Sequence, residues 1–139
     1  MVDVSLEQAR EVLRAQPFSR LLDAELVRFD ASGVALRIPV TAQLRQQNDF
    51  VHGGVLSYAA DNALTFAGGA CLGAAVVTSE FKINYLRPAT GKWLLTRAAV
   101  VHAGRRQAVC RCELYGSDGA DEVLCAVAQG TIVPLPGTD

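Results

Sequence analysis

The chain has 139 residues, 50% of them hydrophobic, and its 13 basic and 14 acidic side chains give a formal net charge of -1. This length and apolar content are sufficient for one globular domain with a real core, and the mixed charge argues against a nucleic-acid-binding surface. Charges among the first twenty residues, and the interruption of the longest apolar run by Asp61 and glycine pairs, argue against a signal peptide and a spanning helix. We therefore expect a cytoplasmic protein with no nucleic-acid or membrane partner.

The first part of the chain predicts a helix followed by a hairpin. Apolar residues share one helical face over 5–15, and Pro17 is expected to end this helix. Strands are predicted over 21–29 and 34–40, with turn residues between them, so the two should pair as a hairpin. The polar stretch 41–49 has no periodicity and is expected to be a loop.

Residues 53–72 are predicted to form a buried helix, because they are apolar nearly all round. Its many alanines and glycines would let a sheet approach closely. Asp61 is its one formal charge, and a carboxylate in such a place is costly unless it is paired, hydrogen-bonded or functional. Asp61 is therefore the first functional candidate, and a structural carboxylate bonded to nearby backbone is the alternative.

Four further strands are predicted after this helix: 76–86, 93–103, 107–115 and 123–133. The short breaks between the last three predict antiparallel hairpins. Alternation in the first of the four places Thr78 on the face opposite Val77 and Phe81. A long helix wrapped by an antiparallel sheet is an α+β architecture, and residues 134–139 are expected to be a frayed tail.

The four cysteines lie inside apolar patterns: Cys71, Cys110, Cys112 and Cys125. No second metal-type residue accompanies Cys110 and Cys112, so we interpret all four as reduced core residues and expect no metal site.

Three motifs in order resemble the PaaI-like branch of the hotdog-fold thioesterases. They are the loop ending in Val51-His52-Gly53-Gly54-Val55, an aspartate nine residues after the histidine, and the strand that begins Thr78-Ser79-Glu80-Phe81 and continues to Ala89. The resemblance runs from about residue 18 to the end of the chain and is sharpest over 46–89. It implies a single hotdog domain over 1–139, with the N-terminal helix in 1–17, that acts as an acyl-CoA thioesterase. Coenzyme A is then part of the substrate, and no separate cofactor is expected.

The resemblance also implies roles for four catalytic residues. Asp61 would be general base or nucleophile, His52 and Gly53 would open the helix and polarise the thioester carbonyl, and Thr78 would assist. Alternatively, His52 orients the loop and Thr78 is a half-buried sheet position. This chain has Gln46 where family members often carry Asn six residues before the histidine.

The spacing of Gly53 and Asp61 predicts a site shared between two chains. The N–H groups of Gly53 and Gly54, unpaired at the positive end of a helix, make a natural oxyanion site. Asp61 lies eight residues beyond Gly53, which is about 12 Å along a helix axis. One helix cannot bring both groups to one carbonyl, so we expect an obligate homodimer with two equivalent sites. A dimer of dimers, a homotetramer, would cover the second face of each sheet.

Several polar residues are expected to contact the substrate. Ser57, Asp61 and Thr65 are spaced four apart and form one polar stripe, with Tyr58 beside it. The arginines at strand ends are either solvated or bind the phosphates of an acyl carrier. The full set of expected substrate contacts is Gln46, Asn48, Gly54, Ser57, Tyr58, Thr65, Arg87, Arg105 and Arg106.

Two other functions remain open. A hotdog domain can be a non-catalytic acyl-CoA binder, which the retained Asp61 disfavours, or an enoyl-thioester hydratase. The hydratase branch typically has Asp and His five apart in one helix, and the only His near this helix precedes it. The acyl group is open between aryl, short and medium chains.

Overall fold

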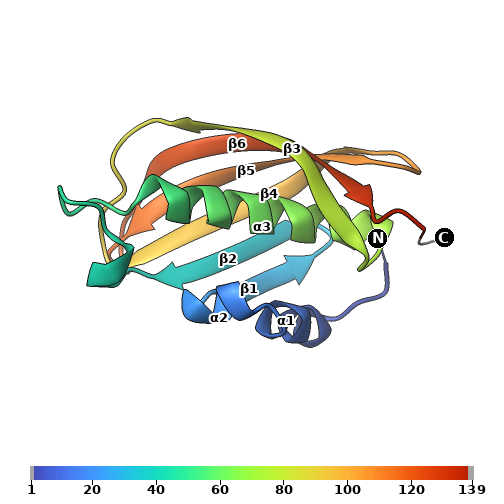
Figure 1. Ribbon diagram of the computed structural model, residues 1–139, viewed down its shortest axis with the longest axis horizontal. Coiled ribbons are helices and arrows are strands. Elements are labelled where there is room, and N and C mark those ends of the chain that lie inside the picture. The colour runs from blue at the N-terminus through green and yellow to red at the C-terminus, as the bar shows by residue number, and fades with distance from the viewer. Residues whose placement is uncertain (1, 138–139) are drawn as a thin grey trace.

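The long helix α3 (Gly53–Leu72) lies across one face of a six-stranded antiparallel sheet (Figure 1). The computed structural model describes residues 2–137. The remaining elements are α1 (Leu6–Arg14), α2 (Pro17–Leu21), β1 (Glu25–Asp30), β2 (Gly33–Pro39), the short 3₁₀ helix η1 (Ala42–Leu44), β3 (Val76–Tyr85), β4 (Trp93–Ala103), β5 (Ala108–Ser117) and β6 (Glu122–Pro134). The strand order β1-β2-β4-β5-β6-β3 leaves β1 and β3 at the two edges, and this arrangement confirms the expected α+β hotdog architecture.

The core lies between α3 and the sheet, where α3 packs against β2, β3, β4, β5 and β6. Ala59, Ala60 and Ala63 are fully buried on this side of the helix. A Cβ added at Gly68 would lie 2.5 Å from the Cβ of Ile132, so only glycine allows the helix and β6 to approach this closely. The prediction that small residues bring the sheet close to the helix is therefore confirmed.

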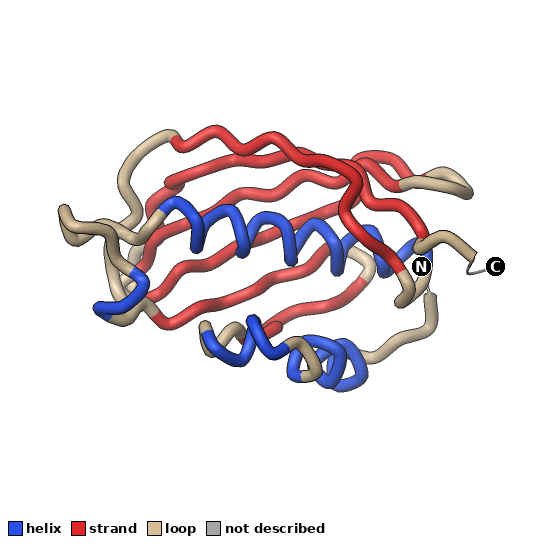
Figure 2. The backbone as a smooth tube through the Cα atoms, in the orientation of Figure 1, coloured by secondary structure: helices blue, strands red, loops and turns tan. Residues whose placement is uncertain are grey.

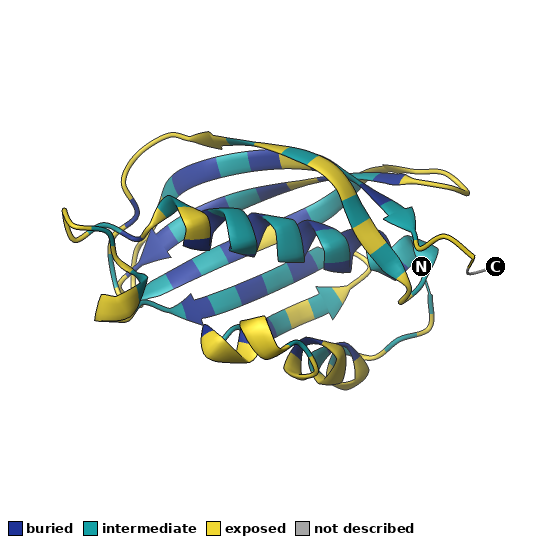
Figure 3. Cartoon of the chain, in the orientation of Figure 1, coloured by how far each residue is buried: buried dark blue, intermediate teal, exposed yellow. Residues whose placement is uncertain are grey.

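The outer face of α3 is less buried than the sequence predicts. Figure 3 shows the helix dark blue toward the sheet, with intermediate and exposed residues on its other side. Ser57, Asp61 and Thr65 on this outer face are all partly exposed. The prediction of a wholly buried helix is wrong for one chain taken alone.

A bulge in β3 changes which residues face the helix. The pairing of β3 with β6 shifts register between Thr78 and Glu80, so Ser79 is an extra residue in β3. Thr78 consequently lies on the same, less exposed side as Phe81 and Ile83, while Val77 is exposed. The prediction that Thr78 and Phe81 occupy opposite faces is wrong, because simple alternation does not anticipate an inserted residue.

The N-terminal segment contains one element that the sequence interpretation missed. Ser5 caps α1 in a capping box with Gln8. Pro17, however, occupies the first turn of α2, so the strand predicted from residue 21 begins only at Glu25. Figure 2 shows both short helices at the β1 end of the sheet, and α1 packs on β1.

The remaining predictions concern the C-terminus and the cysteines. The predicted tail begins inside a strand, because β6 extends through Pro134. Four of the six tail residues are described, and residues 138 and 139 lie outside the described residues. Cys110, Cys112 and Cys125 are buried and unpaired, whereas Cys71 is only half-buried. Burial raises the pKa of the Cys110 thiol to about 11 and that of Cys112 to about 12. No helix within residues 2–137 is both long and apolar enough to span a bilayer.

Candidate active site

A hydrogen-bonded cluster forms around the Asp61 carboxylate at the middle of α3. The Thr78 hydroxyl, on β3, donates to Asp61 Oδ1 at 2.6 Å. The Thr65 Oγ1, one helical turn beyond Asp61, lies 2.8 Å from Thr78 Oγ1 and 2.8 Å from the Asp61 carbonyl oxygen. We call Asp61, Thr65 and Thr78 the Asp61 cluster.

The hydroxyl protons of the Asp61 cluster can be assigned by counting, because each hydroxyl carries one proton. The Thr78 hydroxyl donates its one hydrogen bond to the carboxylate, so it can only accept a hydrogen bond from Thr65. The Thr65 proton is then shared between Thr78 and the Asp61 carbonyl. The second carboxylate oxygen, Oδ2, has no hydrogen-bond partner among residues 2–137, and it is not one of the buried unsatisfied atoms. The cluster therefore fixes one carboxylate oxygen and leaves the other open to solvent.

His52 caps the N-terminus of α3. Its Nδ1 accepts the Gly54 N–H at 2.8 Å, so Nδ1 is unprotonated in this arrangement. The Gly54 N–H is consequently engaged, contrary to the expectation of two unpaired amides. The Gly53 N–H has no partner among residues 2–137, and it is the amide at this helix end that is open to a ligand.

Tyr85 lies directly over Gly53, and the sequence interpretation did not identify it as a site residue. Its hydroxyl donates to the Gly53 carbonyl at 3.0 Å and lies 2.7 Å from Ser57 Oγ. Gln46, Gly53, Tyr85 and Arg87 line one recess at this end of the helix. Alternation along β3 points Tyr85 toward the helix, but its proximity to Gly53 depends on β3 running opposite to α3, which no local pattern reveals.

Gly53 and Asp61 contact opposite ends of β3. Thr78, near the start of this strand, bonds to Asp61, and Tyr85, its last residue, contacts Gly53. The structure therefore keeps the open amide and the open carboxylate oxygen apart within one chain. This agrees with the helical distance of about 12 Å between residues eight apart.

Other predicted contact residues make different contacts from those expected. The amide oxygen of Gln46 accepts the Asn48 N–H, so this oxygen orders the loop. The Tyr58 hydroxyl points into a buried network, not along the stripe: it lies 2.5 Å from Ser19 Oγ and accepts from Asn62 at 2.9 Å. The Asp61 cluster and the recess at the N-terminus of α3 do not include Arg105 and Arg106, which are exposed and line a recess with the C-terminal end of α3.

Comparisons with known proteins agree with this architecture. A family model described as the thioesterase superfamily matches residues 48–123. The medium/long-chain acyl-CoA thioesterase YigI of Salmonella typhimurium is 27% identical over 122 residues, covering 73% of this chain and 77% of the relative. The acyl-coenzyme A thioesterase PaaI of Escherichia coli is 31% identical over 97 residues, covering 69% of each chain. The crystal structure of a thioesterase family protein from Silicibacter pomeroyi superimposes with a TM-score of 0.87 at 32% identity, covering 96% of this chain and all of the other.

Proposed function

This chain belongs to the thioesterase superfamily, and we propose that it hydrolyses acyl-CoA thioesters at sites shared between two copies of the chain. The observation that carries the proposal is the half-exposed Asp61 carboxylate, which has one oxygen held by Thr78 and the other open. The activity is that of the relatives named YigI and PaaI, which are acyl-CoA thioesterases.

In the proposed reaction the two open groups act on one thioester carbonyl. Asp61 Oδ2 takes a proton from water while the water oxygen attacks the carbonyl carbon, and the Gly53 N–H of the second copy donates to the developing oxyanion. The tetrahedral intermediate then collapses, the carbon–sulfur bond breaks and the thiolate of coenzyme A takes up the proton that Asp61 had accepted, which regenerates the carboxylate. In the alternative route Asp61 attacks the carbon itself, the carbon–sulfur bond breaks and the coenzyme A thiolate leaves, and water then hydrolyses the resulting anhydride and regenerates the carboxylate. The arrangement of the Asp61 cluster is compatible with both.

Two features support a shared site. Gly53 and Asp61 face different ends of β3 within one chain, so neither end alone offers both groups. In addition, β3 is a ten-residue edge strand that pairs only with β6 among residues 2–137, and the polar stripe of α3 beside it is partly exposed. A second copy that covered this edge could pair with its free backbone N–H and C=O groups and enclose the stripe.

Subunit mixing tests the proposal. Asp61→Ala removes the carboxylate, and Gly53→Val blocks the helix N-terminus, because even a Cβ at Gly53 would lie 3.3 Å from the Tyr85 hydroxyl. Each variant alone should be inactive. In a mixed dimer one site combines the intact Asp61 of one chain with the intact Gly53 of the other, so activity should return to about one site per dimer.

The assay measures free thiol released from a panel of acyl-CoA thioesters. Heterodimers that form and stay inactive would contradict the shared site, whereas an active monomer would contradict the need for a second copy. If the wild-type protein binds acyl-CoA and releases no thiol, it is a binder, and if it adds water to an enoyl-CoA, it is a hydratase. Mixing two differently tagged wild-type samples controls for the efficiency of exchange.

A further inference from the structure

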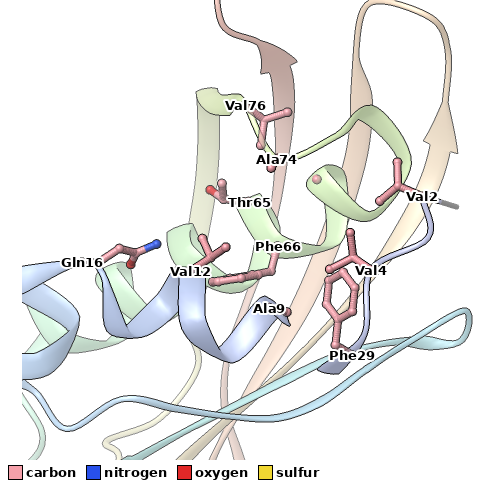
Figure 4. A pocket seen from close by; sticks show the side chains of 11 residues that line it. Val2, Val4, Ala9, Val12, Gln16, Phe29, Thr65, Phe66, Ala74 and Val76 are labelled. Carbon is pink, nitrogen blue, oxygen red and sulfur yellow. The ribbon is translucent and has the colours of Figure 1, made fainter. Parts of the chain in front are cut away.

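An apolar cavity of about 130 Å³ lies between α1 and the C-terminal half of α3 (Figure 4). Its walls come from the N-terminal segment, α1, β1, α3 and the start of β3, and its principal apolar side chains are Val4, Val12, Phe29, Phe66 and Val76. The rings of Phe29 and Phe66 meet edge to face, with centroids 6.5 Å apart. None of these five apolar residues belongs to the Asp61 cluster.

Thr65 belongs both to the cavity wall and to the Asp61 cluster. Thr65 lines the cavity and its hydroxyl contacts both Thr78 and the Asp61 carbonyl. Thr65 lies four residues beyond Asp61, about 6 Å along the helix, and Gly69, also in the cavity wall, lies about 12 Å beyond Asp61. A group that starts at the carboxylate must therefore be about 6 Å long to enter the cavity and about 12 Å long to cross it.

Val2 and Val4 of the N-terminal segment line the far end of the cavity. The Val2 N–H donates to the Ala70 carbonyl at 2.7 Å, which holds this segment against the end of α3. At the other side Gln16 forms a polar rim, and its amide oxygen accepts from Ser19 at 2.6 Å and from Asn62 at 3.2 Å. The cavity thus has mostly apolar walls, with polar side chains at Gln16 and Thr65.

We propose that this cavity binds the apolar end of the acyl group whose thioester carbon is attacked at Asp61, and that it selects acyl groups long enough to reach it. The inference rests on the proposed thioesterase function. An apolar cavity of about 150 Å³ holds a benzene molecule, so this one suits a group of similar size, either the end of a medium-length alkyl chain or a phenyl ring. An acetyl group would not reach it.

Gly69 offers a substitution that fills the cavity and keeps the fold. A Cβ added there meets only Val76 Cγ2 within 4 Å, at an ordinary contact distance of 3.5 Å. Replacing a helical glycine also favours the helix. Gly69→Ala and Gly69→Leu therefore place one and four carbons in the cavity in a graded series.

Val12 offers an independent second position with a matched control. It is 45% exposed and lines the cavity from α1, so Val12→Trp can cover the opening without displacing the core. Val101 on β4 is 54% exposed and does not line the cavity. Val101→Trp therefore introduces the same side chain at a similar exposure and should leave the substrate preference unchanged.

The experiment measures kcat/KM for acetyl-, hexanoyl-, phenylacetyl- and decanoyl-CoA. The wild-type protein should prefer the three longer substrates to acetyl-CoA, and the hexanoyl and phenylacetyl arms show whether the cavity takes an alkyl end or a ring. Since one methylene in an apolar pocket changes specificity by about ten-fold or more, Gly69→Leu and Val12→Trp should lower the decanoyl-to-acetyl ratio at least ten-fold. The decanoyl-to-acetyl ratio of Gly69→Ala should lie between that of the wild type and those of Gly69→Leu and Val12→Trp.

Two outcomes would overturn the inference. One is a decanoyl-to-acetyl ratio that stays at the wild-type value in Gly69→Leu and Val12→Trp, and the other is an equal fall of that ratio in Val101→Trp. The affinity of the Asp61→Asn variant for decanoyl-CoA, measured by calorimetry with and without Gly69→Leu, gives a readout that needs no turnover. If the wild-type protein releases no thiol but Gly69→Leu weakens this binding, the proposed function fails and the acyl site stands.

Discussion

Two polar clusters lie on the outer side of α3. Asp61 of one cluster and Asn62 of the other are adjacent in sequence, but the two clusters differ in how completely their hydrogen bonds are satisfied. Tyr58 and Asn62 belong to a partly buried network with Gln16 and Ser19, of which Ser19 is only 1% exposed. We call these four residues the Tyr58 network. The Asp61 cluster is likewise partly buried, but it keeps one carboxylate oxygen without a partner among residues 2–137.

The difference separates a structural role from a chemical one. The Tyr58 network joins the α1–α2 segment to α3 with neutral groups that bond to one another, as buried polar groups must. The Asp61 cluster uses its hydroxyls to hold a charged group that stays accessible. Substitutions in the Tyr58 network should therefore change stability, and substitutions in the Asp61 cluster should change rate.

The largest expected effect is on rate, from Asp61→Asn. The amide keeps the size of the carboxylate and can still bond to Thr78, so the melting temperature should stay close to that of the wild type. Loss of a general base lowers kcat by about a hundred-fold to ten-thousand-fold. Thiol release from acyl-CoA measures the rate, and a circular dichroism melt measures the fold. Wild-type kcat in a folded Asp61→Asn variant would place the chemistry elsewhere.

The next effect sharpens the role of Thr78 as a positioning residue. Thr78→Val keeps the shape of the side chain but removes the hydroxyl that holds Asp61 Oδ1. Misplacement of a catalytic group by about 1 Å can cost a hundred-fold in rate, so kcat should fall by about that factor or somewhat less. Thr78→Ser, which restores the hydroxyl, should recover most of it. Wild-type kcat in Thr78→Val would show that the hydroxyl does not position Asp61, and equal loss in both variants would show that the hydroxyl alone is not sufficient.

The sequence predicts the fold better than it predicts the site. Helix 53–72 and strand 93–103 are predicted with their observed bounds, because their patterns are long and unmixed. α2 is missed because a proline can begin a helix as well as end one, and the face of Thr78 is wrong because a bulge breaks alternation.

For the site, the local sequence identifies individual candidate residues but does not show which residues lie next to them in the folded protein. Asp61 stands out as a charge in an apolar helix, and the glycines after His52 mark a helix start. Tyr85 and the Tyr58 network depend on which segments come together in three dimensions, thirty or more residues apart in sequence. The spacing along one helix predicts that Gly53 and Asp61 lie apart, because that distance is fixed by helical geometry.

A smaller effect, on stability alone, is expected from the Tyr58 network. Tyr58→Phe removes the hydroxyl that contacts Ser19 and accepts from Asn62, and it leaves those buried groups short of a partner. Such a loss costs about 1–3 kcal/mol of unfolding free energy. Urea unfolding measures this loss, and kcat should remain near the wild-type value. A variant that kept its stability but lost activity would move Tyr58 into the active site and erase the distinction between the two clusters.

The smallest expected effect is the pH dependence of the difference in unfolding free energy between the wild type and Tyr58→Phe. Burial raises the pKa of Tyr58 above its usual value of 10.0, although bonds with Ser19 and Asn62 partly oppose this. Because the folded state holds the proton more tightly, the neutral hydroxyl contributes stability that is complete below about pH 10 and is lost as the pH rises through the folded-state pKa. Tyr58→Phe cannot titrate at this position, so the stability difference between the two proteins should be constant up to about pH 9 and shrink above pH 10. Comparing the two proteins cancels the titration of the buried cysteines and of Tyr115, which both retain. A difference that stays constant to pH 11 would show that the hydroxyl ionises equally in the folded and unfolded chains, and the Tyr58 network would then be no more enclosed than the Asp61 cluster.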